Sequence, residues 1–344
     1  MLRATMTKPG EIVFEDVQVP VAGDNQVLVK MARIGVCGSD MHVYHGKHPY
    51  TSYPVVQGHE VTAVVEKCGN GVVDFAPGDR VTVQPQVFCG KCALCREGDY
   101  HICESLKVMG FQTEGMAQEY FLVDQSKLIH IPDELDLDSG ALIEPVAVGV
   151  HAVRRLGNVK GKKVLVFGAG PIGNLTAQAA KAMGAQSVMI TDLSDYRIQK
   201  AVECGIDFCV NTAKEDLKEA VLKNFGKDGA DAIFECIGIQ PTMDQAISIA
   251  RKGTTIMVVG VFGDVPKVDL GLVQDRELTL RGTLMYKRED FDDAIRFMAD
   301  KKIVVSPLIS RHFAFKDYLQ AYKFIEESKD LAMKILIDIF SKSK

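Results

Sequence analysis

Residues 164–173 read Val-Leu-Val-Phe-Gly-Ala-Gly-Pro-Ile-Gly, and this stretch decides the fold. Its first four residues are continuously apolar, as in a strand buried on both faces, and an apolar helical pattern runs over residues 172–183. Between strand and helix lies a G-x-G-x-x-G turn. Its glycines allow a tight turn, close approach of a pyrophosphate, and close packing of helix on strand. We therefore predict a dinucleotide-binding turn formed by Gly168, Gly170, Pro171, Ile172 and Gly173.

A carboxylate follows this turn at the distance expected for ribose recognition. Asp192 lies 19 residues after Gly173 and ends the next predicted strand, where it can accept hydrogen bonds from the adenosine ribose hydroxyls and repel a 2′-phosphate. Capping of the next helix is the structural alternative for Asp192. Arg197 is close enough to contact the adenine or a phosphate. The pattern favours NAD as the coenzyme.

Strand and helix patterns alternate from residue 162 onward. Short, nearly continuous apolar strands separated by helices are typical of a parallel sheet covered on both faces. We predict an α/β fold with a doubly wound parallel sheet, a Rossmann coenzyme domain, over residues 151–285. Its strands are expected at 164–167, 187–191, 208–210, 232–236 and 256–261, with helices at 172–183 and 196–204.

The first 150 residues have a different character. Short β-like runs at 27–32, 61–66 and 80–83 are separated by glycine- and proline-containing turns. We predict a β-barrel-like domain over 1–150, completed by about 286–344, a segment that includes helices near 291–301 and 317–327.

Composition excludes several classes of protein. The chain has 344 residues, 47% of them hydrophobic and 25% charged, with a formal net charge of −5, as in ordinary globular domains. No basic block supports binding to nucleic acid or to an anionic membrane. The apolar stretches are far shorter than the ~18–20 residues of a spanning helix, and the start lacks the apolar core of a secretion signal. We expect a cytoplasmic protein.

Four of the nine cysteines fall within fifteen residues, at Cys89, Cys92, Cys95 and Cys103. An odd total and tight clustering are poor evidence for disulfides and good evidence for a metal. Four thiolates fill a tetrahedral site and leave no open position, so the metal would be structural. Zinc is favoured over an iron–sulfur cluster.

A second, open metal site is predicted in the same domain. A catalytic zinc needs about three protein ligands and one exchangeable position. Cys37 and His59 are the firmest candidates, and Glu60 or Glu144 could complete the set. Asp40 is positioned in sequence to hold the second ring nitrogen of His59, as carboxylates often do for metal-bound histidines.

Together these motifs resemble the zinc-dependent medium-chain alcohol dehydrogenases, and within them the sorbitol (polyol) dehydrogenase group. The resemblance covers essentially the full length. It implies a GroES-like catalytic domain, a Rossmann domain, two zinc ions per chain and a homodimer or homotetramer. It further implies that Cys37 and His59 bind the catalytic zinc, that Glu60 and Glu144 share the carboxylate role, and that Ser39 and His42 form the proton relay.

The resulting functional prediction is oxidation of a secondary alcohol to a ketone with NAD⁺. Polyols, sugar alcohols and sugar acids are the expected substrates, with threonine or 2,3-butanediol as alternatives. A zinc-free reductase of the same fold and a non-catalytic binding protein are the rival readings. Polyol dehydrogenases typically carry an arginine before a tyrosine where this chain has Met285-Tyr286. Met285 cannot donate hydrogen bonds to substrate hydroxyls, so sorbitol itself is not the expected substrate.

Overall fold

The structure, a computed structural model, describes residues 1–340. Backbone contacts divide the chain into two compact units, residues 1–144 with the chain's end from 309 onward, and residues 145–308. We expected the boundaries at 150 and about 286, so the segment 286–308 groups with the middle unit and not with the first. The two units are described separately below.

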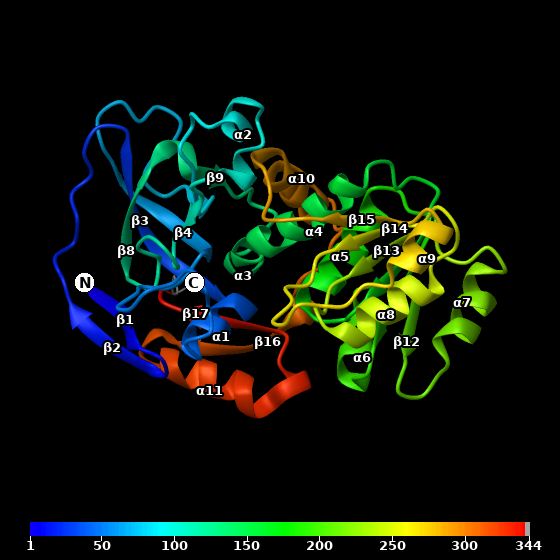
Figure 1. The fold of residues 1–344 in the computed structure, drawn as a ribbon. Helices are drawn as coiled ribbons and strands as arrows, with labels where there is room; N and C mark the ends of the chain where they lie inside the picture. The colour runs from blue at the N-terminus through cyan, green and yellow to red at the C-terminus, as the bar shows by residue number, and fades with distance from the viewer. Residues whose placement is uncertain (341–344) are drawn as a thin grey trace. The chain divides into compact units, whose positions relative to one another are not determined.

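The middle unit is built on a six-stranded parallel sheet (Figure 1). Along the sheet the strands follow the order β12-β11-β10-β13-β14-β15, which is the 3-2-1-4-5-6 order of a doubly wound nucleotide-binding fold. Every neighbouring pair is parallel, as the apolar strand patterns predicted. The strands are β10 (Lys163–Phe167), β11 (Ser187–Asp192), β12 (Phe208–Asn211), β13 (Ala232–Glu235), β14 (Thr255–Val258) and β15 (Thr279–Gly282).

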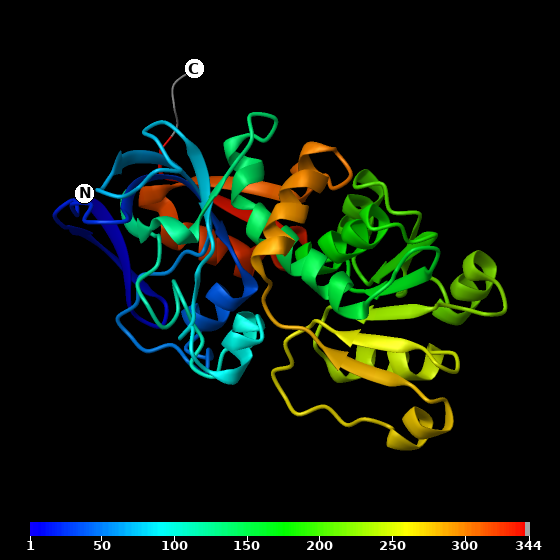
Figure 2. The ribbon, with the colours of Figure 1, turned by 90° about the horizontal axis from the view of Figure 1, so that it is seen from above.

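Helices cover both faces of this sheet (Figure 2). Both faces of the sheet are apolar, so both must be covered. The crossover helices cover them by packing their own apolar sides against the strands. The predicted helices at 172–183 and 196–204 are confirmed within a residue at each end. The helices are α4 (Ile143–Leu156), which begins in the first unit, α5 (Pro171–Ala182), α6 (Asp195–Glu203), α7 (Leu217–Phe225), α8 (Gln240–Ile249), α9 (Leu270–Asp275), α10 (Arg288–Ala299) and η3 (Ser306–Leu308).

The first unit is mainly β-structure, with a sheet in the order β16-β17-β3-β4-β5-β9. Strand β3 is long and central, and it also pairs with β8. Among residues 1–340, β16 and β17 form the one parallel pair along this order, and the other pairs are antiparallel. The strands are β3 (Gln26–Val36), β4 (Glu60–Cys68), β5 (Arg80–Val83), β8 (Tyr120–Asp124), β9 (Leu128–His130), β16 (Ile309–Ala314) and β17 (Lys334–Asp338), with small pairs β1 (Leu2–Lys8) and β2 (Glu11–Asp16), and β6 (Gln86–Val87) and β7 (Lys107–Val108).

Short helices close the ends of this sheet. The helix α1 begins directly after β3, so the end of a rigid central strand positions the residues at its start. The α-helices are α1 (Gly38–Tyr44), α2 (Ala93–Arg96), α3 (Leu137–Ala141) and α11 (Tyr318–Ser328), and the 3-10 turns are η1 (Tyr100–Ile102), η2 (Gln125–Lys127), η4 (Phe315–Asp317) and η5 (Lys329–Leu331). Among residues 1–340, no helix has the length and apolar character needed to cross a membrane.

Candidate functional site

The glycine turn after β10 has the geometry of a phosphate-binding turn. Gly168 has φ +96°, which favours glycine, and a Cβ on Gly173 would lie 1.8 Å from the Gly168 carbonyl oxygen. Gly170 is different, because a Cβ there would meet nothing within 4 Å, and this residue is the N-cap of α5. Two glycines therefore serve the turn itself, and the third leaves open space at a helix N-terminus, where a pyrophosphate fits.

Asp192 ends β11 beside this turn. Its carboxylate accepts hydrogen bonds from the backbone N–H groups of Ala169 (2.9 Å), Leu193 (2.8 Å) and Ser194 (3.0 Å). Arg197 lies 3.8 Å from it. The cap of α6 is Ser194, not Asp192, so the capping alternative for Asp192 is wrong. The aspartate instead joins the end of β11 to the glycine turn, with an arginine next to it.

The four clustered cysteines converge on one point in the first unit. Their sulfur atoms all lie within 4.8 Å of one another, and the individual separations include 3.5 Å for Cys89–Cys103 and 3.9 Å for both Cys89–Cys95 and Cys92–Cys103. Sulfur ligands about 2.3 Å from a tetrahedral zinc lie about 3.8 Å apart. The spacing therefore fits one enclosed tetrahedral ion.

Backbone amides prepare this cluster for a cation. The N–H groups of Lys91 and Cys92 point at the Cys89 sulfur, at 3.5 and 3.3 Å. These bonds stabilise the thiolate and lower the pKa of Cys89 to about 6. Burial and the neighbouring Cys92 and Cys103 sulfurs instead raise the pKa of Cys95 to about 12, so a bound cation is what would bring all four cysteines into the thiolate form.

A second group of donor atoms lies where β3 ends and β4 begins. The ligand atoms of Cys37, His59 and Glu60 are all within 4.8 Å of one another, and His59 and Glu60 are buried. Cys37 directly follows β3 and is the N-cap of α1, while Glu60 opens β4 and pairs with Gly35 of β3. The pairing of two adjacent strands therefore brings together residues more than 20 positions apart. This donor set, one sulfur, one imidazole and one carboxylate, is characteristic of a catalytic zinc.

A buried lysine that the motifs did not reveal completes this group. Lys334, at the start of β17, donates to both carboxylate oxygens of Glu60, and both side chains are almost fully buried. The pairing of Ile335 with Val36 places Lys334 opposite the end of β3. Gly35 makes room for the carboxylate, because a Cβ there would lie 2.3 Å from its Oε2. In the sequence, the signal for a buried lysine was its place directly before the apolar residues 335–337.

The charges around His59 are strongly negative. Burial alone would lower the pKa of His59, but the Asp40 carboxylate and the Cys37 sulfur outweigh it and raise this pKa to about 10. Asp40 Oδ1 lies 3.7 Å from His59 Nδ1, an ion-pair distance that is longer than a hydrogen bond. The structure thus places Asp40 next to the ring nitrogen of His59, as predicted, but without a direct hydrogen bond between them. The same negative surroundings favour a metal cation, which would replace the proton on the ring nitrogen that it binds.

The other predicted site residues, Glu144, Ser39 and His42, differ in how far they are buried. Glu144 is buried and close enough to raise the pKa of His59, yet among the described residues it is outside the group of atoms within 4.8 Å. Ser39 and His42 both lie on α1, three residues apart and so on one face of the helix. Ser39 is half-buried and His42 is exposed. The helix therefore runs from the donor group toward solvent.

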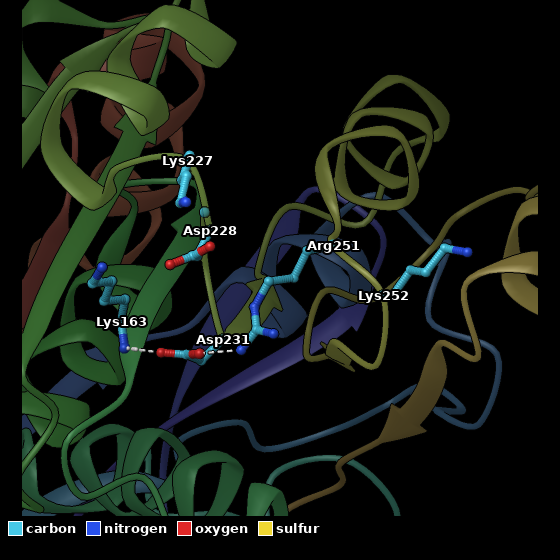
Figure 3. Close-up of a pocket in the computed structure, with 7 residues that line it drawn as sticks. Lys163, Lys227, Asp228, Asp231, Arg251 and Lys252 are labelled. Atoms are coloured by element: carbon cyan, nitrogen blue, oxygen red, sulfur yellow. Dashed lines mark hydrogen bonds and ion pairs between the residues drawn. The ribbon is translucent and has the colours of Figure 1, made fainter.

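Of two cavities in the described part of the chain, one lies away from these donor groups and the other adjoins His59 through Phe111. One, of about 460 Å³, is at the amino ends of the strands of the middle unit, where Asp231 pairs with Arg251 and accepts from the Lys163 backbone (Figure 3). Parallel sheets bind nucleotides at the opposite, carboxyl edge, so this cavity is not the coenzyme site. The other, of about 570 Å³, is in the first unit, and its wall includes Phe111, whose ring packs 4.9 Å from that of His59.

The segment that follows β15 contains Met285 and Tyr286, where the resemblance to polyol dehydrogenases leads us to expect an arginine before the tyrosine. Met285 adopts φ +53°, a left-handed conformation that is unfavourable for a side chain of this size, while Tyr286 is fully buried. Arg288 pairs along α10 with Asp292, at 3.7 Å. Met285 cannot supply the hydrogen-bond donor that the missing arginine would provide.

Comparison with known proteins identifies the class. The model of the alcohol dehydrogenase GroES-like domain matches residues 23–133, and that of zinc-binding dehydrogenase matches residues 171–300. The chain is 35% identical over 333 residues to sorbitol dehydrogenase of Halalkalibacterium halodurans, covering 95% of this chain and 96% of the relative. The chain belongs to the zinc-binding dehydrogenase family, and it is an alcohol dehydrogenase with the expected GroES-like and Rossmann-type domains.

Other relatives differ in the substrate and coenzyme that they are named for. The chain is 37% identical to 2-dehydro-3-deoxy-L-galactonate 5-dehydrogenase of Pseudoalteromonas atlantica, over 93% of this chain and 92% of that one. A zinc-binding dehydrogenase from Sinorhizobium meliloti, solved with NADP, superposes with a TM-score of 0.91 at 30% identity, covering 98% and 99% of the two chains. A dehydrogenase from Escherichia coli, solved with NADH, gives 0.90 at 27% identity, with 98% and 99% covered. Zinc and a nicotinamide coenzyme are thus properties of the family.

Proposed function

We propose that this protein oxidises a secondary hydroxyl group of a polyol or sugar acid to a ketone, with NAD⁺ as the hydride acceptor and two zinc ions per chain. The observation that carries the proposal is the convergence of Cys37, His59 and Glu60 within 4.8 Å. A zinc-free reductase would not need this buried donor set. The four-cysteine cluster supports the second, structural ion.

Each group of residues has a definite part in this reaction. Cys37, His59 and a carboxylate of Glu60 or Glu144 would hold the catalytic zinc. When bound, the zinc supplies Lewis acidity that lowers the pKa of the substrate hydroxyl, and NAD⁺ supplies the hydride acceptor. Buried Asp40 and Glu144 keep the surroundings of His59 negative, which favours retention of a divalent cation.

The proton needs a route from the buried site to water. We assign Ser39 to the first transfer, because it is half-buried and only two residues from Cys37. His42 follows three residues later on the same helix face and is exposed. A hydroxyl followed by an imidazole can pass a proton outward, because each of these groups can both accept and donate a proton.

The substrate class rests on the relatives and on Met285. The relatives are named for sorbitol and for a sugar acid, and both types carry adjacent secondary hydroxyl groups. Met285 offers no hydrogen-bond donor to a hydroxyl-rich substrate, which counts against sorbitol. We therefore place sugar acids ahead of sorbitol, with threonine and 2,3-butanediol as the alternatives.

A substrate panel tests this function directly. We expect NADH formation, followed at 340 nm, with at least one polyol or sugar acid among sorbitol, xylitol, L-galactonate, threonine and 2,3-butanediol. Treatment with a chelator should abolish the activity, and added zinc should restore it. Chelator-insensitive turnover would contradict the zinc mechanism. Turnover confined to threonine or butanediol would contradict the substrate class alone.

The preference for NAD over NADP should depend on Asp192. In an Asp192→Ala variant we expect kcat/KM for NAD⁺ to fall about 10- to 100-fold, the value of one or two hydrogen bonds to a charged group. The ratio of NADP⁺ to NAD⁺ activity should rise, because the repulsion of a 2′-phosphate is removed. Initial rates with the two coenzymes measure this.

The neighbouring Asp195 offers a matched control. It lies in the first turn of α6 and interacts with Lys214 and Asn211 at the surface, away from the glycine turn. Asp195→Ala should leave the coenzyme ratio unchanged. An unchanged ratio in the Asp192 variant as well would refute the ribose role.

A further inference from the structure

A chain of buried hydrogen bonds links the C-terminal helix α11 to the predicted zinc ligand His59. The Tyr322 hydroxyl donates to Gln57 Oε1 at 2.8 Å, and Gln57 Nε2 donates to Asp40 Oδ1 at 3.1 Å. Asp40 Oδ1 in turn faces His59 Nδ1 at 3.7 Å. All four residues are at most 4% exposed. Tyr322 and Gln57 are 265 residues apart in sequence.

The direction of these hydrogen bonds follows from the groups that face Gln57. Its amide nitrogen lies near Asp40 Oδ1 and, at 3.4 Å, the Asp40 carbonyl oxygen, both of which are acceptors. The amide must therefore present its NH₂ group to Asp40 and its oxygen to Tyr322. The tyrosine hydroxyl then has to be the donor. The orientation of the Gln57 amide is therefore determined by Asp40 on one side and by the Tyr322 hydroxyl on the other.

Asp40 is held by donors on both of its oxygens. The Cys37 backbone N–H donates to Oδ2 at 2.8 Å, and Gln57 donates to Oδ1, the oxygen directed at His59. Gln57 thus helps to determine how far Oδ1 lies from the histidine ring. The Tyr322 ring has little freedom, because Tyr44 stacks on it at 5.1 Å and Tyr318 packs edge-on at 5.5 Å.

We propose that Tyr322 and Gln57 are positioning residues, which aim the Asp40 carboxylate at His59 and so tighten the binding of zinc at the Cys37–His59 site. The proposal rests on the function above, because it requires a metal at that site. Partners of metal-bound histidines typically change metal affinity 10- to 100-fold when they are lost. Without Tyr322 the Gln57 oxygen would be buried with no donor, and the amide could turn away from Asp40.

The test is zinc release from the intact, zinc-loaded protein into a chromogenic chelator. We expect two phases, one for each proposed zinc. Tyr322→Phe, which keeps the ring, should release the Cys37-site zinc about tenfold faster and leave the four-cysteine phase unchanged. Gln57→Met should do at least as much. The double variant should release zinc no faster than Gln57→Met alone, because both residues act through one chain.

Controls distinguish a failure of this proposal from a failure of the proposed zinc site, and from a general loss of stability. Tyr53→Phe removes a hydroxyl of the same unit that donates to the Val43 carbonyl oxygen and not to Gln57, so both phases should keep their wild-type rates. Wild-type release rates in both Tyr322→Phe and Gln57→Met would overturn the positioning role. If Cys37→Ser has the zinc content and release profile of the wild type, the metal site itself, and with it the proposed function, is wrong. A variant that accelerates both phases equally is destabilised as a whole, which also counts against the proposal.

Discussion

Replacing Cys37 by serine is expected to lower kcat/KM by on the order of 10³-fold, because a Lewis acid contributes several kcal/mol to stabilising the charge that develops on the substrate oxygen. Zinc content should fall from two ions per chain to one. Binding of NAD⁺ should persist, because the glycine turn and Asp192 lie in a separate compact unit. Steady-state rates, metal analysis and coenzyme titration measure the three effects.

Cys68 provides the matched control for this variant. It belongs to the same unit, is half-buried and donates to the Phe75 carbonyl oxygen at 3.3 Å, but it is outside both groups of donor atoms. Cys68→Ser should keep two zinc ions and nearly full activity. If Cys37→Ser also retained its turnover, the catalytic zinc site would have to be abandoned.

The second large effect is expected on stability, from Lys334→Met. This change removes the cation that neutralises Glu60 and leaves a carboxylate buried without its partner. Breaking a buried ion pair in this way typically costs about 3–5 kcal/mol of the free energy of unfolding. Burial lowers the pKa of Lys334, but Glu60 more than reverses this, so the lysine is charged in the folded protein. Urea-induced unfolding of the chelator-treated proteins measures the loss, because a zinc ion bound by Glu60 would itself neutralise this carboxylate.

A double variant separates charge from packing. In Lys334→Met with Glu60→Gln, neither member of the pair is charged, so much of the lost stability should return. A surface substitution such as Lys214→Met, which removes an exposed partner of Asp195, should change the stability by less than about 1 kcal/mol. Equal losses in the single and double variants would show that packing of the lysine chain, and not the charge of Glu60, is what matters.

The coenzyme turn and the cysteine cluster could be predicted because their chemistry is local. The glycines of residues 168–173 determine one backbone turn, and the four cysteines lie within fifteen residues, so spacing along the chain already limits their geometry. The strands and helices that we predicted in the middle unit lie within about three residues of their observed ends, because apolar periodicity reports burial directly. The strand β15 and the helices α4, α7, α8 and α9 were not predicted. The side chains of Cys37, His59 and Glu60 are of types that bind metals, so the sequence identified them as candidates. It was the resemblance that implied that they share one zinc ion.

The parallel sheet, the glycine turn, the aspartate beside it and the four-cysteine cluster could all be inferred from the amino-acid sequence alone. The fold was needed to show that Lys334 neutralises Glu60 and that Tyr322 reaches Asp40 through Gln57. The physical reason is that these contacts join residues far apart in the chain. They form where β17 and β4 pair with β3 and where α11 covers the same core, and no periodicity or spacing within a segment records such pairings.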